Sequence, residues 1–192
     1  MKPIRAFIAL NLPADAVQKA MEIQTRLRQA AGEAGMRVGW VRPANMHLTL
    51  KFLGDIVPES TVAIAAALQQ GLAGRPALEL SLRGVGAFPD PARPRVLWLG
   101  LHTAGEALPA LAGDVEAWLD ELGFPREKRP YHPHLTLGRV KAGRADLVSA
   151  LAEEPVCDCT ASEVVLYESR LMKQGAEYKA INRISLGAQA KA

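Results

Sequence analysis

The sequence predicts an α+β fold of two pseudo-symmetric lobes, each an antiparallel sheet with packed helices. Short β-type runs alternate with amphipathic helical patterns, and many connections between them have the length of a hairpin turn. The tetrapeptide His-Leu-Thr-Leu occurs twice, at residues 47–50 and 134–137, once in each half of the 192-residue chain. We therefore expect residues 1–192 to form a single domain in which the two motif strands meet in a central groove.

In the first half, apolar side chains recur near helical spacing in two segments, which predicts two helices. Gly32 favours the end of the first helix, and Pro58 favours the start of the second. Apolar runs rich in β-forming residues predict the strands. In chain order we expect a strand, a helix, a short strand, the first motif strand and a helix, at residues 4–10, 13–31, 38–41, 47–53 and 58–72.

In the second half, two apolar runs flank a Pro/Arg-rich loop and predict a hairpin. An amphipathic helical pattern follows, and Gly123 favours its end. The expected elements are strands at 78–85 and 95–101, a helix at 108–122, the second motif strand, a short helix at 144–152, and strands at 156–168 and 178–186. Each half thus contains a strand, a helix and a His-bearing strand in similar order. We interpret this order as an ancient duplication, with lobes related by a pseudo-two-fold axis.

Composition excludes several classes of protein. The chain is 49% hydrophobic and 22% charged, as in ordinary globular domains, and its net charge of +3 suits an anionic ligand without the dense basic clusters of a strong nucleic-acid binder. Arg5 interrupts the N-terminal apolar run, which has no signal-peptide cleavage pattern, and no stretch is as long as a membrane span. We therefore expect a cytoplasmic protein without membrane association. Cys157 and Cys159 are too few for a disulfide framework and are expected to be reduced.

The repeated motif places its two polar side chains on one face of each predicted strand. Side chains alternate between the two faces of a strand, so His47 and Thr49 share one face while the two leucines share the other. His134 and Thr136 repeat this arrangement. A single copy would favour a structural histidine, but two copies that use two of only four histidines favour function. Two imidazoles can carry out proton transfer on both sides of a phosphodiester near neutral pH.

A zinc site is the alternative that the other histidines raise. His132 and His134 have the spacing at which two imidazoles on one strand can bind zinc, with His47 as a third ligand. No carboxylate is obviously placed to complete such a site, and the two threonines would have no use in it. We therefore predict that no metal is bound. His102 is expected to be a turn residue without a role.

Cations and aromatic residues near the motifs are further candidates for contacts with a substrate. Arg139 lies five residues after His134, so an ideal strand would aim it away from the groove, whereas a local bulge would turn it back. Lys141 also extends the second motif strand, and Arg5 and Lys51 occupy comparable strand positions in the first half. A basic loop precedes the second motif and suits steering of a phosphate backbone, with Arg126, Lys128 and Arg129. Four aromatic residues could stack a base or belong to the core: Phe7, Trp40, Phe52 and Tyr131.

These motifs resemble the 2H phosphoesterase superfamily, which is named for two His-x-Thr/Ser-x motifs on pseudo-symmetric lobes. Within it the chain is most similar to the RNA 2′,3′-cyclic phosphodiesterases, historically called 2′-5′ RNA ligases. The resemblance covers nearly the whole chain. It is carried by residues 5–13, 45–54, 95–100, 133–139 and 166–169, together with Tyr178.

The resemblance implies metal-independent hydrolysis of an RNA 2′,3′-cyclic phosphate to a 2′-phosphate, without a cofactor. Thr49 and Thr136 would hold the phosphate oxygens, and Arg139 is a further candidate for binding the substrate. His134 would be the proton acceptor and His47 the proton donor, although the pseudo-symmetry alone does not order these roles. Because the two histidines must be in opposite protonation states at the same time, the rate should depend on pH as a bell-shaped curve around the ordinary histidine pKa of about 6.5.

Three alternatives remain open at the level of sequence. They are ligation of 2′-5′ RNA ends in the same groove, an RNA-end or nucleotide-binding module with little turnover, and a zinc hydrolase. The expected partners are RNA 3′ ends or small nucleotides that bear a 2′,3′-cyclic phosphate. Because no segment suggests an interface, we expect a monomer.

Overall fold

A computed structural model describes residues 2–172 and 175–187, and within these ranges it contains nine strands, three α-helices and two 3₁₀ turns. The strands are β1 (Ile4–Asn11), β2 (Arg37–Trp40), β3 (Leu48–Ile56), β4 (Leu78–Phe88), β5 (Val96–His102), β6 (His134–Ala142), β7 (Pro155–Ala161), β8 (Glu163–Met172) and β9 (Gly175–Ser185). The helices are α1 (Ala14–Glu33), α2 (Ser60–Leu72) and α3 (Ala107–Asp120), and the 3₁₀ turns are η1 (Pro43–Asn45) and η2 (Ser149–Leu151). The α+β class is therefore confirmed.

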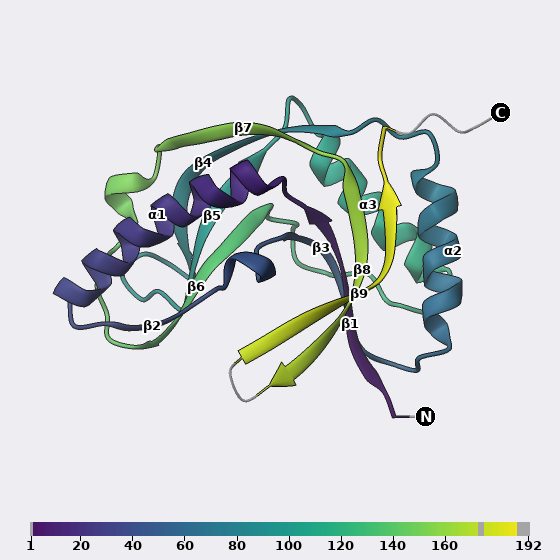
Figure 1. The fold of residues 1–192 in the computed structure, drawn as a ribbon, viewed down its shortest axis with the longest axis horizontal. Coiled ribbons are helices and arrows are strands. Elements are labelled where there is room, and N and C mark those ends of the chain that lie inside the picture. Colours follow the sequence, from purple (N-terminus) through teal and green to yellow (C-terminus); the bar gives the residue numbers. More distant parts are fainter. Residues whose placement is uncertain (1, 173–174, 188–192) are drawn as a thin grey trace.

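All strands belong to one curled antiparallel sheet in the order β7-β4-β5-β6-β3-β1-β8-β9, with β2 paired to β6 (Figure 1). The sheet divides at its centre, where β3 and β6 pair through Leu48 and Leu135. We call β1, β3, β8 and β9, with α2 and α3, the His47 lobe. We call β2, β4, β5, β6 and β7, with α1, the His134 lobe. Each motif strand thus lies at the inner edge of its lobe, which confirms the predicted arrangement.

The lobes do not coincide with the two halves of the sequence. Helix α1 follows β1 in the chain but packs against β2, β6 and β7 of the other lobe. Helix α3 follows β5 but packs against β3, and α2 packs against α3 and β9. Figure 1 shows α1 at one end of the molecule and α2 with α3 at the other. The two lobes therefore exchange helices, because α1 and α3 each follow a strand of one lobe and pack on the other.

Two further segments differ from expectation. The helix expected at 144–152 is reduced to η2, because the Asp146 carboxylate accepts hydrogen bonds from the backbone N–H groups of Val148 and Ser149 and forms a local turn in place of helical bonds. The single strand expected at 156–168 is two strands that break at Ser162. Here the chain leaves the outer edge of the His134 lobe as β7 and enters the His47 lobe as β8.

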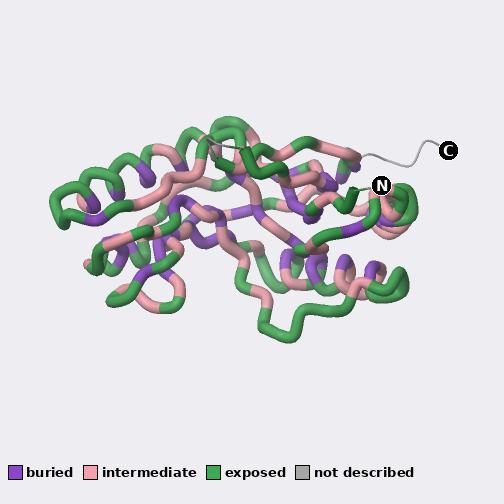
Figure 2. The backbone as a smooth tube through the Cα atoms, turned by 90° about the horizontal axis from the view of Figure 1, so that it is seen from below, coloured by how far each residue is buried: buried purple, intermediate pink, exposed green. Residues whose placement is uncertain are grey.

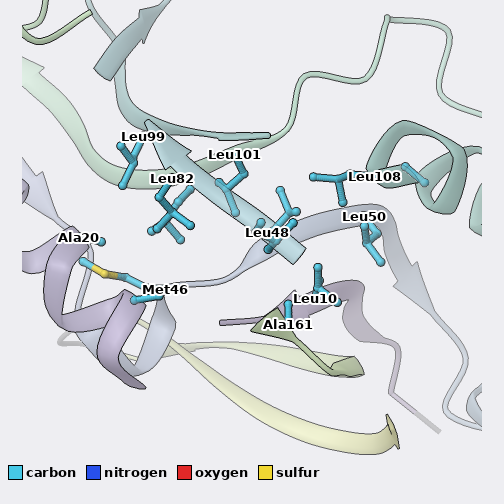
Figure 3. Packing of buried hydrophobic residues seen from close by; sticks show 14 of the residues in the cluster. Leu10, Ala20, Met46, Leu48, Leu50, Leu82, Leu99, Leu101, Leu108 and Ala161 are labelled. Carbon is cyan, nitrogen blue, oxygen red and sulfur yellow. The ribbon is translucent and has the colours of Figure 1, made fainter. Parts of the chain in front are cut away.

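Apolar side chains from every layer meet behind the motif strands. Leu48, Leu50, Leu135 and Leu137 are all buried, as the alternation of the motif predicts. Figure 3 shows Leu48 and Leu50 among side chains from β1, β5 and α3. Buried residues follow the central strands, while the outer faces of the helices are exposed (Figure 2). In the described part of the chain, no helix has the length and apolar character needed to cross a membrane.

One buried polar side chain joins α1 to the second motif strand. Gln24 is 5% exposed, and its amide Nε2 donates hydrogen bonds to the carbonyl oxygens of Val41 at 2.8 Å and Leu137 at 2.9 Å. The Leu137 oxygen also accepts a bond from the Val41 N–H at 3.0 Å. Buried backbone carbonyls need such donors, so Gln24 fixes the end of the motif strand against the helix.

We expect Gln24→Leu to lower the free energy of unfolding by about 1–3 kcal/mol, because it leaves buried carbonyl oxygens without their side-chain donor. Urea denaturation followed by circular dichroism measures this loss. Gln29→Leu, on the exposed face of the same helix, is the matched control. Equal stability of the two variants would contradict the bracing role of Gln24.

Candidate active site

The pairing of β3 with β6 brings the four polar motif residues to one place. Leu48 lies opposite Leu135 in an antiparallel register, so His47 faces Thr136 and Thr49 faces His134 across the junction. All four side chains are partly buried and line one groove with a volume of about 1370 Å³. The predicted meeting of the two motifs in a groove is thus what the structure shows.

A β-bulge follows the threonine of each motif. On β3, the register with β1 passes from Thr49 to Lys51 and leaves out Leu50. On β6, the register with β5 passes from Thr136 to Gly138 and leaves out Leu137. An extra residue shifts the alternation of side chains by one, so the fifth residue after each histidine returns to the groove face.

These fifth residues are Phe52 and Arg139, and both line the groove. The suggestion that a bulge would turn Arg139 toward the site is therefore confirmed. Burial is the main cause that lowers the pKa of His134, and charge repulsion from the exposed Arg139 adds to the shift. Arg5 also lines the groove, whereas Lys141 is not among the groove residues.

His47 lies in an aromatic environment formed by three strands. Its ring stacks on Phe7 of β1 with centroids 4.8 Å apart, and it meets Tyr178 of β9 in a T-shaped arrangement with centroids 5.2 Å apart. Tyr167 of β8 lies 6.0 Å away. Burial among these rings, which disfavours the charged imidazolium, lowers the pKa of His47 to about 4, while a hydrogen bond with the Asn45 backbone opposes the shift.

His134 is surrounded by a second set of rings. Phe88 meets it edge to face at 5.1 Å, and the centroids of Trp98 and His132 lie 6.4 and 6.3 Å away. Burial lowers the pKa of His134 as well. The His134 Nδ1 atom lies 2.7 Å from the carbonyl oxygen of His132, an acceptor, so the neutral ring carries its proton on Nδ1 and leaves Nε2 as a proton acceptor.

Lys51, one of the candidate cations for contacts with a substrate, lines the groove but is buried and paired. It is 4% exposed, and its ammonium forms an ion pair with Glu116 of α3 and donates a hydrogen bond to the Pro125 carbonyl at 2.8 Å. The Glu116 carboxylate also accepts a bond from the backbone N–H of Glu127 at 3.2 Å. The bulge at Leu50 allows Lys51 to reach Glu116 and the Pro125 carbonyl. These contacts connect the loop at 124–130 to the motif strand.

The basic loop carries less free charge than its sequence indicates. Arg126 lies 3.3 Å from the Asp120 carboxylate, and Arg129 lies 2.7 Å from Glu127. Both arginines and Lys128 line the groove. Steering of a phosphate backbone by this loop stays a prediction.

The four aromatic candidates fall into different environments. Phe7 is buried against His47, and Tyr131 is half-buried with its hydroxyl donating to the Thr49 carbonyl at 3.1 Å. Trp40 packs under the Arg28 guanidinium, 5.4 Å from its ring centroid. Phe52 alone among the four is exposed to solvent.

Tyr167 and Tyr178 belong to the resemblance, but their ring contacts with His47 were not predicted, because strands from the C-terminal part of the chain bring them there. Among the described residues, no three His, Cys, Asp or Glu side chains are grouped as metal ligands. His132 lines the groove, and its ring lies 4.9 Å from Trp98. His102 is exposed at the end of β5 and is not among the groove residues.

A family model described as LigT like phosphoesterase matches residues 10–98 and 100–178. The chain belongs to the LigT-like phosphoesterase family. Two curated members of similar sequence are each named RNA 2′,3′-cyclic phosphodiesterase. The protein of Methanothermobacter thermautotrophicus is 36% identical over 184 residues, which cover 91% of this chain and 95% of that protein. The protein of Aeropyrum pernix is 33% identical over 166 residues, which cover 83% of this chain and 92% of that protein.

Solved structures show the same LigT-like fold. A Thermus thermophilus protein has a TM-score of 0.80 and 28% identity, with 97% of this chain and 100% of that chain covered. The apo form of Escherichia coli LigT has a TM-score of 0.75 and 28% identity, with 98% and 100% covered. Escherichia coli LigT has also been crystallised with ATP and with 3′-AMP. The predicted resemblance to the 2H phosphoesterases, and with it the expectation of a phosphoesterase enzyme, is confirmed.

The lowered pKa of His47 predicts a loss of stability in acid. The unfolded chain takes up this proton below about pH 6.5, whereas the folded protein takes it up only near pH 4, so acid favours the unfolded state. We expect the free energy of unfolding to fall by roughly 3 kcal/mol between these limits from this group. Urea denaturation at several pH values should show a shallower fall for His47→Asn than for the wild type. Parallel curves would contradict the burial of a neutral His47.

Proposed function

We propose that this protein hydrolyses the 2′,3′-cyclic phosphodiester at RNA 3′ ends to a 2′-phosphomonoester, by acid/base catalysis with two histidines. The observation that carries the proposal is the β3–β6 junction, where one residue pair sets two His/Thr pairs face to face in an open groove. The names of the curated relatives supply the substrate class. The arrangement needs neither a metal nor a cofactor to move the two protons.

In the proposed reaction, water attacks the phosphorus atom while Nε2 of His134 accepts one of its protons. The bond from phosphorus to the 3′ oxygen breaks, and His47 donates a proton to that oxygen. The hydrogen bond from His134 Nδ1 to the His132 carbonyl supports the role of proton acceptor, because it fixes the tautomer with a free Nε2 lone pair. Thr49 and Thr136 donate hydrogen bonds to the non-bridging oxygens, and Arg139 balances the charge that develops on them.

The role of His47 as proton donor requires that the substrate change its pKa. In the free protein, burial holds this pKa near 4, so the ring is neutral at neutral pH. An anionic phosphate in contact with the imidazole favours the charged form and raises the pKa. Binding of the cyclic phosphate is therefore coupled to uptake of the proton that His47 then donates.

Ligation of 2′-5′ RNA ends would use the same residues, with the 5′ hydroxyl of a second RNA in place of water as the group that attacks phosphorus while the bond to the 3′ oxygen breaks, and is the second candidate activity. A binding module with little turnover is less well supported, because binding alone requires neither an Nε2 acceptor nor a second imidazole.

The first test is hydrolysis of an oligonucleotide that ends in a 2′,3′-cyclic phosphate, in the presence of EDTA. We expect wild-type protein to form the 2′-phosphate, and His47→Ala or His134→Ala to lower kcat by roughly 100- to 10,000-fold, the usual contribution of one acid or base. His102→Ala is the control, since His102 lies outside the groove. Loss of wild-type turnover in EDTA, restored by zinc, would support the zinc hydrolase and make His132 a candidate ligand.

The pH profile gives a second test. Because burial lowers both histidine pKa values, kcat/KM, which reports the free protein, should have its optimum below about pH 6.5. Bound phosphate raises the pKa of His47, so the optimum of kcat should lie at higher pH than that of kcat/KM. Initial rates over a range of substrate concentrations and pH values measure both. Coincident optima would argue against proton uptake by His47 on binding.

A further inference from the structure

The groove extends beyond the residues that the proposed reaction uses. Its volume is about 1370 Å³, whereas pockets that enclose a drug-sized ligand usually have roughly 300–1,000 Å³. Besides the two motifs, it is lined by residues 125–130 of the loop that leads to β6 and by one face of α3 with Pro109, Ala112, Gly113 and Glu116. The groove therefore has room for more of a substrate than its terminal nucleotide.

The loop at 124–130 brings an excess of positive charge to this part of the groove. It contains three cations, Arg126, Lys128 and Arg129, and one carboxylate, that of Glu127. The carboxylate is used within the loop, because it accepts hydrogen bonds from the backbone N–H groups of Lys128 at 2.9 Å and Arg129 at 3.1 Å and pairs with the Arg129 guanidinium. Among the described residues, no carboxylate lies within ion-pair distance of the exposed Lys128 ammonium. Lys128 is thus available to an anion in the groove.

Two largely buried charges hold the backbone of this loop. The Lys51 ammonium donates a hydrogen bond to the Pro125 carbonyl oxygen at 2.8 Å. One oxygen of Glu116 accepts bonds from Lys51 and, at 3.2 Å, from the backbone N–H of Glu127. The two backbone groups lie on either side of Arg126. The ion pair therefore connects β3, α3 and the loop at the point where the loop enters the groove.

A further contact places the loop next to the motif residues. The hydroxyl of Tyr131, directly after the loop, donates to the Thr49 carbonyl oxygen at 3.1 Å. Thr49 faces His134 across the junction, and the loop precedes His134 in the chain. The cations of the loop therefore lie beyond this pair, at one end of the reaction site.

We propose that the loop at 124–130 is a subsite for the phosphodiester backbone of the RNA upstream of the terminal nucleotide, and that Lys51 and Glu116 position it. The inference rests on the proposed function for the placement of the cyclic phosphate between the histidines. From that nucleotide the RNA chain continues through the 5′ oxygen, so the next phosphates lie farther along the groove. Cations beside a groove bind such phosphates without reading the bases. Lys51 and Glu116 are positioning residues, because they contact the loop and not the RNA.

This assignment distinguishes an RNA end from a mononucleotide. Both present the same cyclic phosphate to the histidines, but only an RNA chain has further phosphates that reach the loop. The protein should therefore bind an oligonucleotide more tightly than a single nucleotide. The difference should shrink as salt is added, because each neutralised phosphate releases counterions on binding.

The test measures the binding of two product-like probes and needs no turnover. One is a short oligonucleotide that ends in a 2′-phosphate, and the other is adenosine 2′-monophosphate. Calorimetric titration at several salt concentrations gives the slope of log Kd against log salt concentration, which should be steeper for the oligonucleotide. Lys128→Gln should lower the oligonucleotide slope by about 0.7, the value for one phosphate contact of a single strand, and leave the mononucleotide slope unchanged.

Lys19→Gln is the matched control for Lys128→Gln. Lys19 is an exposed cation of α1 outside the groove, so this substitution makes the same change in net charge and should retain both wild-type slopes. Equal slopes for the two probes in the wild type, or an oligonucleotide slope that Lys128→Gln leaves unchanged, would overturn the subsite.

The double variant Lys51→Met with Glu116→Leu tests the positioning residues. Replacing both partners leaves no buried charge unpaired. We expect a weaker affinity and a shallower slope for the oligonucleotide, with wild-type binding of adenosine 2′-monophosphate. Equal losses for both probes would overturn the positioning role. If this variant does not fold, Lys51→Met with Glu116→Gln, which keeps an acceptor for the Glu127 N–H, should show a smaller loss of the same kind.

The proposed function fails separately from the subsite. It fails if the wild type hydrolyses neither adenosine 2′,3′-cyclic phosphate nor an oligonucleotide with a cyclic phosphate end. A steeper oligonucleotide slope that Lys128→Gln lowers would support the subsite even then, because the binding measurement does not depend on turnover.

Discussion

The junction of β3 with β6 is the constraint on which the site depends. Two lobes with separate helices meet there through Leu48 and Leu135, both buried in the core. In an antiparallel register, a slip by one residue would turn the histidines and threonines toward the core and the leucines toward the groove, so the apolar core itself enforces the alignment of the polar residues. The burial of the four leucines thus stabilises the arrangement of the polar residues, although the leucines themselves take no part in the chemistry.

The two bulges extend this arrangement, and each is braced by a buried polar side chain. On the His134 lobe, Gln24 of α1 donates to the bulged Leu137 carbonyl. On the His47 lobe, the residue after the bulge is Lys51, whose ammonium pairs with Glu116 of α3. In each case the helix that supplies the brace follows a strand of the opposite lobe. This exchange of helices ties the geometry of each motif strand to the packing of the other lobe.

The two histidines are held by similar contacts. Each imidazole lies against aromatic rings, and each is linked to the backbone two residues before it, His47 to Asn45 and His134 to His132. The backbone contact at His134 fixes the tautomer, and the surrounding rings make a free imidazolium costly. A site of this kind favours neutral rings until an anion arrives. Charge in the groove is then determined by the substrate together with Arg5, Lys128 and Arg139, since two arginines of the nearby loop are paired with carboxylates.

The sequence by itself determined the α+β class, the approximate helices and strands, and the four polar motif residues, because these depend on local periodicity and on a repeated pattern of alternating side chains. It left Arg139 dependent on a bulge and named Lys51 among the cations that could contact a substrate. Only the tertiary structure decided that α1 covers the His134 lobe, that Lys51 is buried, and that Phe52 and Arg139 both line the groove. These features depend on contacts between residues far apart in the chain and on one extra residue in each motif strand. Alternation within a single strand carries no information about such a shift in register, because the shift is defined only against the neighbouring strand.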